Sequence, residues 1–260
     1  MTGAERITAA INAANERGET ALVPFFTAGY PSCEQFAETL TTIAERADVV
    51  EIGVPFSDPM ADGPTIQRSS HHAIANGASL RWILASLRDL GERVTAPVVL
   101  MSYLNPLLAY GLDELADAAA TAGVAGFIVP DLPLEESAPV HAAFRRAGLA
   151  LVQLVTPATP EQRQHDLVAA SDGFVYAVTV RGITGGAAGL PAATADYLAG
   201  LMHVAGDKPV CAGFGIRAAS DVAAVGQHVN GAVVGSALIE AQERGDDIAA
   251  FLAHLRAARV

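Results

Sequence analysis

The sequence has few of the side chains on which many enzymes depend. Among 260 residues it has one lysine, Lys208, and two cysteines, Cys33 and Cys211. The lysine precedes a proline at the start of an expected strand, so an aldolase that forms a Schiff base at the catalytic end of a barrel is not expected. The cysteines are far apart and lack metal-site spacing, which favours a reducing, cytoplasmic setting and gives no sign of a disulfide framework.

Positive charge and long apolar runs are also scarce. The formal net charge of −12 argues against a partner such as nucleic acid or an anionic membrane. No run of 18 or more apolar residues occurs, so no transmembrane helix is expected. Residues 1–20 lack a basic start followed by an apolar block, which predicts an amphipathic helix and not a signal peptide. A phosphorylated small substrate stays compatible, because backbone N–H groups at helix N-termini bind phosphate.

The histidines offer no catalytic cluster either. All seven are expected on helices or at helix edges, and none ends a strand, so no metal site is expected. A Gly-x-Ser-x-Gly motif is absent, and neither cysteine has a histidine placed to activate it. Carboxylates and a tyrosine remain, and these side chains suit proton transfer.

Apolar, strand-like runs alternate with helical patterns along the whole sequence. The expected strands lie at 21–26, 48–54, 97–103, 124–130, 149–155, 173–179, 208–212 and 231–235. The clearest helical patterns lie at 34–46, 113–122, 135–147, 160–170 and 217–226. Near-continuous apolar strands alternating with amphipathic helices are typical of a parallel sheet covered on its faces.

Eight strand–helix units predict an α/β fold, a (β/α)₈ TIM barrel with an extra N-terminal helix, in one domain over 1–260. A doubly wound open sheet is the main alternative. That fold favours a GxGxxG motif after the first strand, and "FFTAGYP" does not supply one.

In such a barrel the active site forms at the carboxyl ends of the strands. Glu51 is the unusual residue there, because it interrupts the apolar run "DVVEIGV". A buried, unpaired carboxylate costs several kcal/mol or stays protonated, with a raised pKa. The alternative is a carboxylate that points outward to an arginine on a neighbouring helix.

Glycines follow the last two expected strands, at Gly213-Phe214-Gly215 and Gly235-Ser236. The loops after strands seven and eight often hold a phosphate in barrels of this class, since glycine lets the backbone approach a ligand closely. Glycines that only form tight turns are the other interpretation.

Several longer motifs are distinctive in combination. They are "VPFFTAGYP" (23–31), "EIGVPFSDPMADGPTIQ" (51–67), "PDLPLEES" (130–137), "GITG" (182–185), "AGFGI" (212–216) and "GSAL" (235–238). Their order and spacing resemble the tryptophan synthase α subunit family across nearly the full chain. The resemblance implies cleavage of indole-3-glycerol phosphate to indole and glyceraldehyde 3-phosphate, without a cofactor on this chain. It also implies an α₂β₂ complex with a β subunit that carries pyridoxal phosphate.

The resemblance also implies roles for individual residues. It makes Glu51 the catalytic acid and base, Asp62 its partner, and Tyr176 a neighbour of the glutamate. The residues implied to bind the rest of the substrate are Phe25, Leu100 and Phe214 for indole, Thr184 on a mobile loop, and Gly182, Gly185, Gly215, Gly235 and Ser236 for phosphate. Tyr103, Asn105, Asp131, Asp58 and Pro59 resemble structural or subunit-contact positions.

One stretch departs from the family pattern. After "GITG" the chain continues as Gly186-Ala187-Ala188-Gly189, without the usual basic residue, so ordering this loop should cost more entropy. Two alternatives to a coupled lyase subunit therefore stay open. One is a stand-alone lyase that releases free indole, and the other is a weakly catalytic subunit that activates its partner.

Overall fold

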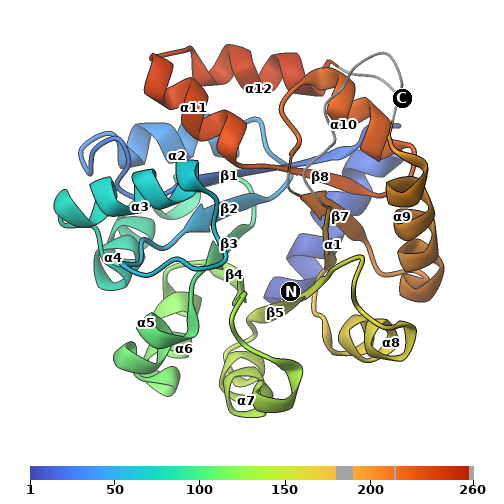
Figure 1. The fold of residues 1–260 in the computed structure, drawn as a ribbon. Helices are drawn as coiled ribbons and strands as arrows, with labels where there is room; N and C mark the ends of the chain where they lie inside the picture. The colour runs from blue at the N-terminus through green and yellow to red at the C-terminus, as the bar shows by residue number, and fades with distance from the viewer. Residues whose placement is uncertain (180–189, 214, 258–260) are drawn as a thin grey trace.

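Eight parallel strands close into a barrel in the computed structural model, which describes residues 1–179, 190–213 and 215–257 (Figure 1). Each strand pairs with the next in sequence, and the last pairs with the first. The strands are β1 (Ala21–Thr27), β2 (Val50–Gly53), β3 (Val98–Met101), β4 (Val124–Ile128), β5 (Ala150–Val155), β6 (Val175–Val178), β7 (Val210–Gly213) and β8 (Gly231–Val234). The predicted TIM barrel is confirmed, with all eight strands inside or overlapping the predicted runs.

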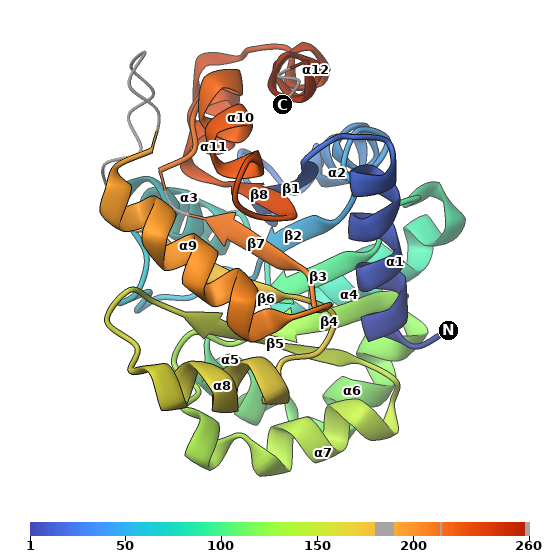
Figure 2. The same ribbon diagram turned by 90° about the vertical axis from the view of Figure 1, so that its right-hand side faces the viewer.

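Helices surround the barrel (Figures 1 and 2). They are α1 (Gly3–Glu16), α2 (Phe36–Ala44), α3 (Pro64–Ala75), α4 (Leu80–Leu90), α5 (Leu104–Tyr110), α6 (Leu112–Thr121), α7 (Ala138–Arg146), α8 (Glu161–Ala170), α9 (Ala192–Ala205), α10 (Ala219–Gly226), α11 (Ser236–Arg244) and α12 (Ile248–Arg256), with single 3₁₀ turns at Gly91–Arg93 and Leu134–Glu136. The predicted helical patterns correspond to α2, α6, α7, α8 and α10. No helix in the described parts of the chain is long and apolar enough to cross a membrane.

The N-terminal helix α1 closes the end of the barrel where the strands begin (Figure 2). A capping box between Thr2 and Glu5 starts it and satisfies two backbone N–H groups. Ile7 and Ile11, four residues apart, are fully buried against the barrel. The Thr8 hydroxyl donates to the Gly173 carbonyl, just before β6, at 2.7 Å. This end is therefore sealed, and the opposite end is left for a site.

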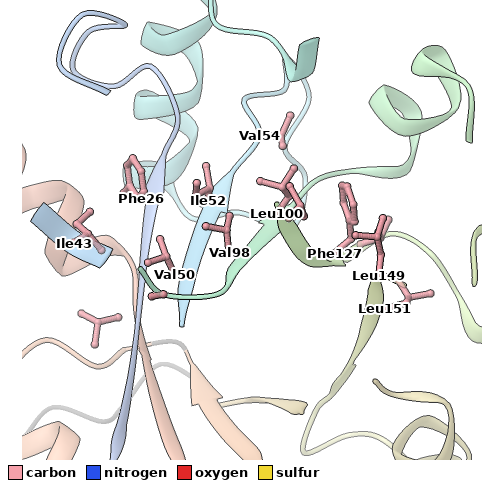
Figure 3. Close-up of a cluster of buried hydrophobic side chains, with 14 of the residues drawn as sticks. Phe26, Ile43, Val50, Ile52, Val54, Val98, Leu100, Phe127, Leu149 and Leu151 are labelled. Atoms are coloured by element: carbon pink, nitrogen blue, oxygen red, sulfur yellow. The ribbon is translucent and has the colours of Figure 1, made fainter. Parts of the chain in front are cut away.

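The buried side chains form two layers because successive residues of a strand point to opposite faces. The inner layer fills the barrel and includes Val23, Val99 and Val233. The outer layer lies between strands and helices, and Figure 3 shows part of it, with Phe26 and Ile52 among the labelled side chains. The strands are apolar on both faces for this reason, as the sequence pattern predicts.

The histidines and the single lysine lie where the sequence analysis predicts. Every histidine is on a helix or, for His228, just after one. Lys208 precedes β7, and its ammonium donates to the carbonyls of Val168 and Ser171 at the end of α8. The lysine therefore lies at the opposite end of the barrel from the strand carboxyl ends, as predicted, and ties helix α8 to the barrel.

We expect Gly3→Ala to lower the free energy of unfolding by about 1–3 kcal/mol, the usual cost of overpacking. A Cβ at Gly3 would lie 1.8 Å from the Ala125 carbonyl oxygen of β4, so α1 would have to move off the barrel. Urea unfolding measures the effect. Gly200→Ala in α9 is the matched control, because no atom lies within 4 Å of its added Cβ. The control should be neutral or up to about 1 kcal/mol more stable, since alanine favours helix. Equal effects of the two changes would contradict the sealing role of α1.

Candidate active site

A cavity of about 570 Å³ opens at the carboxyl ends of the strands. Its size suits a small-molecule ligand. The predicted site residues that line it are Phe25, Glu51, Asp62, Tyr176, Gly215, Gly235 and Ser236. Residues from β1, β2, β6, β7 and β8 or their following loops thus meet in one place, which only the closed barrel allows.

Glu51 lies on β2 and lines this cavity. Its register partners are Phe25 on β1 and Val99 on β3. The side chain is 1% exposed, and its Oε2 atom has no hydrogen-bond partner among the described residues. Burial, and then the nearby charge of Asp62, raise the pKa of Glu51 to about 8. The alternative of an outward carboxylate paired with an arginine is therefore wrong.

Asp62 lies in the loop between β2 and α3, held by a tyrosine from the next unit. The Tyr103 hydroxyl donates to Asp62 Oδ2 at 3.1 Å and accepts from the Ala61 N–H at 2.9 Å. The Tyr103 ring also stacks on Phe56, with ring centroids 5.3 Å apart. Burial raises the pKa of Asp62 to about 6, and the Tyr103 hydrogen bond opposes that rise. The loop carboxylate therefore has a fixed position and a lower pKa than Glu51.

Two glycines make room for the aromatic walls. A Cβ at Gly213 would lie 2.2 Å from the Tyr176 hydroxyl oxygen, and a Cβ at Gly53 would lie 2.5 Å from the Phe25 ring. Side chains at either glycine would displace these rings. The pKa of the buried Tyr176 hydroxyl is raised well above its ordinary value, first by burial and then by Glu51. Tyr176 therefore stays neutral beside the glutamate.

The prediction that Leu100 lines the indole site is wrong by one residue. Leu100 pairs with Ile52 and Phe127 and lies in the outer layer, under the helices (Figure 3). Met101, the next residue on β3, lines the cavity. Because side chains alternate along a strand, a shift of one residue exchanges the two faces.

Three of the predicted phosphate residues, Gly215, Gly235 and Ser236, line the cavity. Gly215 has a φ of +91°, which disfavours other residues there. Gly235 precedes α11, whose first residue is Ser236. The first N–H groups of a helix lack intrahelical partners and favour an anion. The predicted residues Gly182, Thr184, Gly185 and Phe214, and the departure at 186–189, lie outside the described residues.

Sequence reasoning missed two charged residues of the cavity and the full role of a third side chain. Arg217 and Glu240 both line the cavity and form an ion pair. Tyr103, expected at a structural or subunit-contact position, also orients Asp62. The available signal for Glu240 was its spacing, because it follows Ser236 by four residues and therefore shares a helix face with it.

Known proteins share the sequence pattern and the fold of this chain. A family model described as tryptophan synthase alpha chain matches residues 11–258. The chain belongs to the tryptophan synthase alpha chain family. Members of this family are lyases that cleave indole-3-glycerol phosphate in tryptophan biosynthesis, and this chain has that activity.

Individual relatives of the tryptophan synthase alpha chain family match over nearly their whole length. The alpha chain of Nitratidesulfovibrio vulgaris strain DP4 is 42% identical over 250 residues, covering 96% of this chain and 97% of the relative. That of Deinococcus radiodurans is 38% identical over 255 residues, covering 98% and 94%. A crystal structure of Mycobacterium tuberculosis tryptophan synthase matches with a TM-score of 0.89 at 33% identity, covering 98% of each chain. The alpha subunit from Legionella pneumophila str. Paris matches with a TM-score of 0.88 at 32% identity, covering 99% and 98%.

We expect Glu51→Gln to stabilise the chain at high pH. The carboxyl ionises near 4.5 in the unfolded chain and near 8 in the folded chain. Between these values the folded state keeps a proton that the unfolded state has lost, so the free energy of unfolding falls as pH rises. Glutamine does not titrate and removes this fall.

Urea unfolding at about pH 5 and about pH 9 measures the difference, which should grow by several kcal/mol in favour of the variant. Glu45→Gln is the control, because Glu45 is exposed and pairs with Arg46 at the surface. If the gap between Glu51→Gln and wild type did not change with pH, the raised pKa would be wrong.

Proposed function

We propose that Glu51 is the acid and base that cleaves indole-3-glycerol phosphate in this chain, with Asp62 as its partner. The observation that supports this most is the buried Glu51 carboxyl, which lines a ligand-sized cavity and whose Oε2 atom has no hydrogen-bond partner among the described residues. Such a carboxyl destabilises the fold and serves no visible packing purpose. A catalytic role explains why the carboxyl is buried there.

The reaction needs one group that first donates and then accepts a proton. Protonated Glu51 gives its proton to indole C3, which converts the ring to an indolenine. The carboxylate then removes the proton of the neighbouring hydroxyl, the C3–carbon bond breaks, and its electron pair returns to the indole ring. The oxygen becomes the aldehyde of glyceraldehyde 3-phosphate, and indole leaves. A pKa of about 8 keeps Glu51 protonated at neutral pH and still lets it exchange its proton readily.

Asp62 stabilises the positive charge that develops on the indole nitrogen. With a pKa of about 6 it is ionised at neutral pH and can accept the ring N–H. The Tyr103 hydrogen bond supports both the position and the charge of this carboxylate. Tyr176, neutral and buried, packs beside Glu51 and excludes water.

The cavity walls fit the two ends of the substrate. Phe25, Met101 and Val233 supply apolar surface for the indole ring. Gly215, Gly235 and Ser236 supply backbone N–H groups and a hydroxyl for the phosphate. The reacting bond would then lie between them, over Glu51.

Exposed apolar side chains near the cavity provide a surface on which a partner that consumes indole can dock. Met60, two residues before Asp62, is 87% exposed, and Leu108 on α5 is 53% exposed. Exposed apolar side chains around a site mark a docking surface. The structural relatives include tryptophan synthase assemblies, so we infer that a β subunit carrying pyridoxal phosphate docks here, in an α₂β₂ complex. A stand-alone lyase is the second candidate, and the partner titration below separates the two.

We expect Glu51→Gln to lower turnover of indole-3-glycerol phosphate by at least about 10²-fold, the usual contribution of a general acid or base. Steady-state assays measure kcat, and binding of an uncleavable substrate analogue should change little because glutamine keeps the size of the side chain. Glu45→Gln, on the surface, should retain wild-type turnover. A near-normal kcat in Glu51→Gln would contradict the assignment of Glu51 as the acid and base.

We expect a β subunit to raise turnover of the wild-type chain by about 10-fold or more, which corresponds to about 1.4 kcal/mol of coupling. Met60→Asp should abolish the activation and keep the basal rate, because a charge in the docking surface opposes burial. Ile74→Asp is the control, an exposed apolar residue at the far end of α3. Turnover measured against β-subunit concentration tests this. A flat titration together with a fast isolated chain would favour the stand-alone lyase.

A further inference from the structure

An ion pair lies at the phosphate side of the cavity. The Arg217 guanidinium contacts the Glu240 carboxylate, and both side chains line the cavity together with Gly215 and Ser236. Arg217 is the only cationic side chain among the described residues of the lining, which also carries the protonated carboxyl of Glu51 and the carboxylate of Asp62. The electrostatics of this side therefore depend on one arginine.

The negative charge of Glu240 by itself disfavours an anion at this side of the cavity. It follows Ser236 by one helical turn on α11, so its carboxylate lies on the helix face that begins at the proposed phosphate site. Its side chain is only 24% exposed. A phosphate dianion at the start of α11 would meet an incompletely screened negative charge. Without Arg217, this charge would oppose binding.

The backbone of Arg217 is anchored, and its guanidinium, paired with Glu240, lines the cavity. The Asp221 carboxylate accepts hydrogen bonds from the backbone N–H groups of Arg217 and Ala218, at 2.8 and 2.9 Å, which anchors this turn at the start of α10. The side chain itself is half-exposed. A guanidinium has five N–H donors in a planar fork, so it can hold a carboxylate on one edge and a phosphate on the other.

We propose that Arg217 contacts the substrate phosphate, and that Glu240 orients the guanidinium and weakens its net attraction. The pair then sets how tightly the cavity holds phosphate, in a chain that must also release phosphorylated product. This inference rests on the proposed function, which places the phosphate at Gly235 and Ser236. The competing interpretation is a clamp that only joins the loop after β7 to α11.

Four variants separate these interpretations: Arg217→Met, Arg217→Lys, Glu240→Gln and the double change. The control is Arg68→Met, which breaks the Arg68–Glu243 pair that joins α3 to α11 outside the cavity lining. The readouts are kcat and KM for indole-3-glycerol phosphate, and the inhibition constants of inorganic phosphate and of indole. Thermal unfolding confirms that each variant is folded.

We expect Arg217→Met to raise KM and the inhibition constant of phosphate by about 10-fold or more, with kcat within about threefold, since a charged hydrogen bond to the phosphate is lost. Arg217→Lys should recover part of the affinity. Glu240→Gln should tighten phosphate by about threefold, because it removes like-charge repulsion. The double change should fall between the single variants. Indole should bind all of them equally, and Arg68→Met should match wild type.

Two results would overturn the inference. One is a phosphate inhibition constant that stays at the wild-type value in folded Arg217→Met. The other is an equal loss of indole and phosphate binding, which a structural clamp predicts. A wild-type chain that neither cleaves indole-3-glycerol phosphate nor responds to inorganic phosphate would instead refute the proposed function, so the two failures are distinguishable.

Discussion

The buried Glu51 carboxyl is the feature on which the site depends. A closed parallel barrel has an apolar interior, and the Glu51 carboxyl there loses its hydration while its Oε2 atom gains no hydrogen-bond partner among the described residues. Both this burial and the charge of Asp62 raise its pKa, so the group stays protonated at neutral pH. Burying Glu51 lowers the stability of the fold locally, and it places a protonated carboxyl where the reaction needs a proton donor.

The surrounding elements keep that carboxyl in a defined geometry. Helix α1 seals one end of the barrel, so the cavity opens only at the other. Gly53 and Gly213 let the rings of Phe25 and Tyr176 close around the acid. Tyr103 fixes Asp62 from a neighbouring strand–helix unit. Two carboxylates with different pKa values, about 8 and about 6, can then hold different protonation states in the same cavity.

The sequence predicted the barrel well, because strands buried on both faces are apolar runs that stand out from helical patterns. The same property explains the error at Leu100. When inward and outward residues are both apolar, composition does not distinguish them, and only the strand register places Met101 in the cavity. The Arg217–Glu240 pair was missed for a different reason. Its members belong to separate units, and their contact depends on how the closed barrel brings α11 beside the loop after β7.

The protonation state of Glu51 tests the central claim most directly. Carbon-13 NMR of the glutamate carboxyl groups, titrated from about pH 5 to about pH 9, would resolve one group that ionises near pH 8. We expect this signal to be absent from Glu51→Gln and to move to lower pH in Asp62→Asn, because the neighbouring negative charge is gone. If every glutamate carboxyl ionised below about pH 6, Glu51 would be a carboxylate at neutral pH. It would then have no proton to donate to indole.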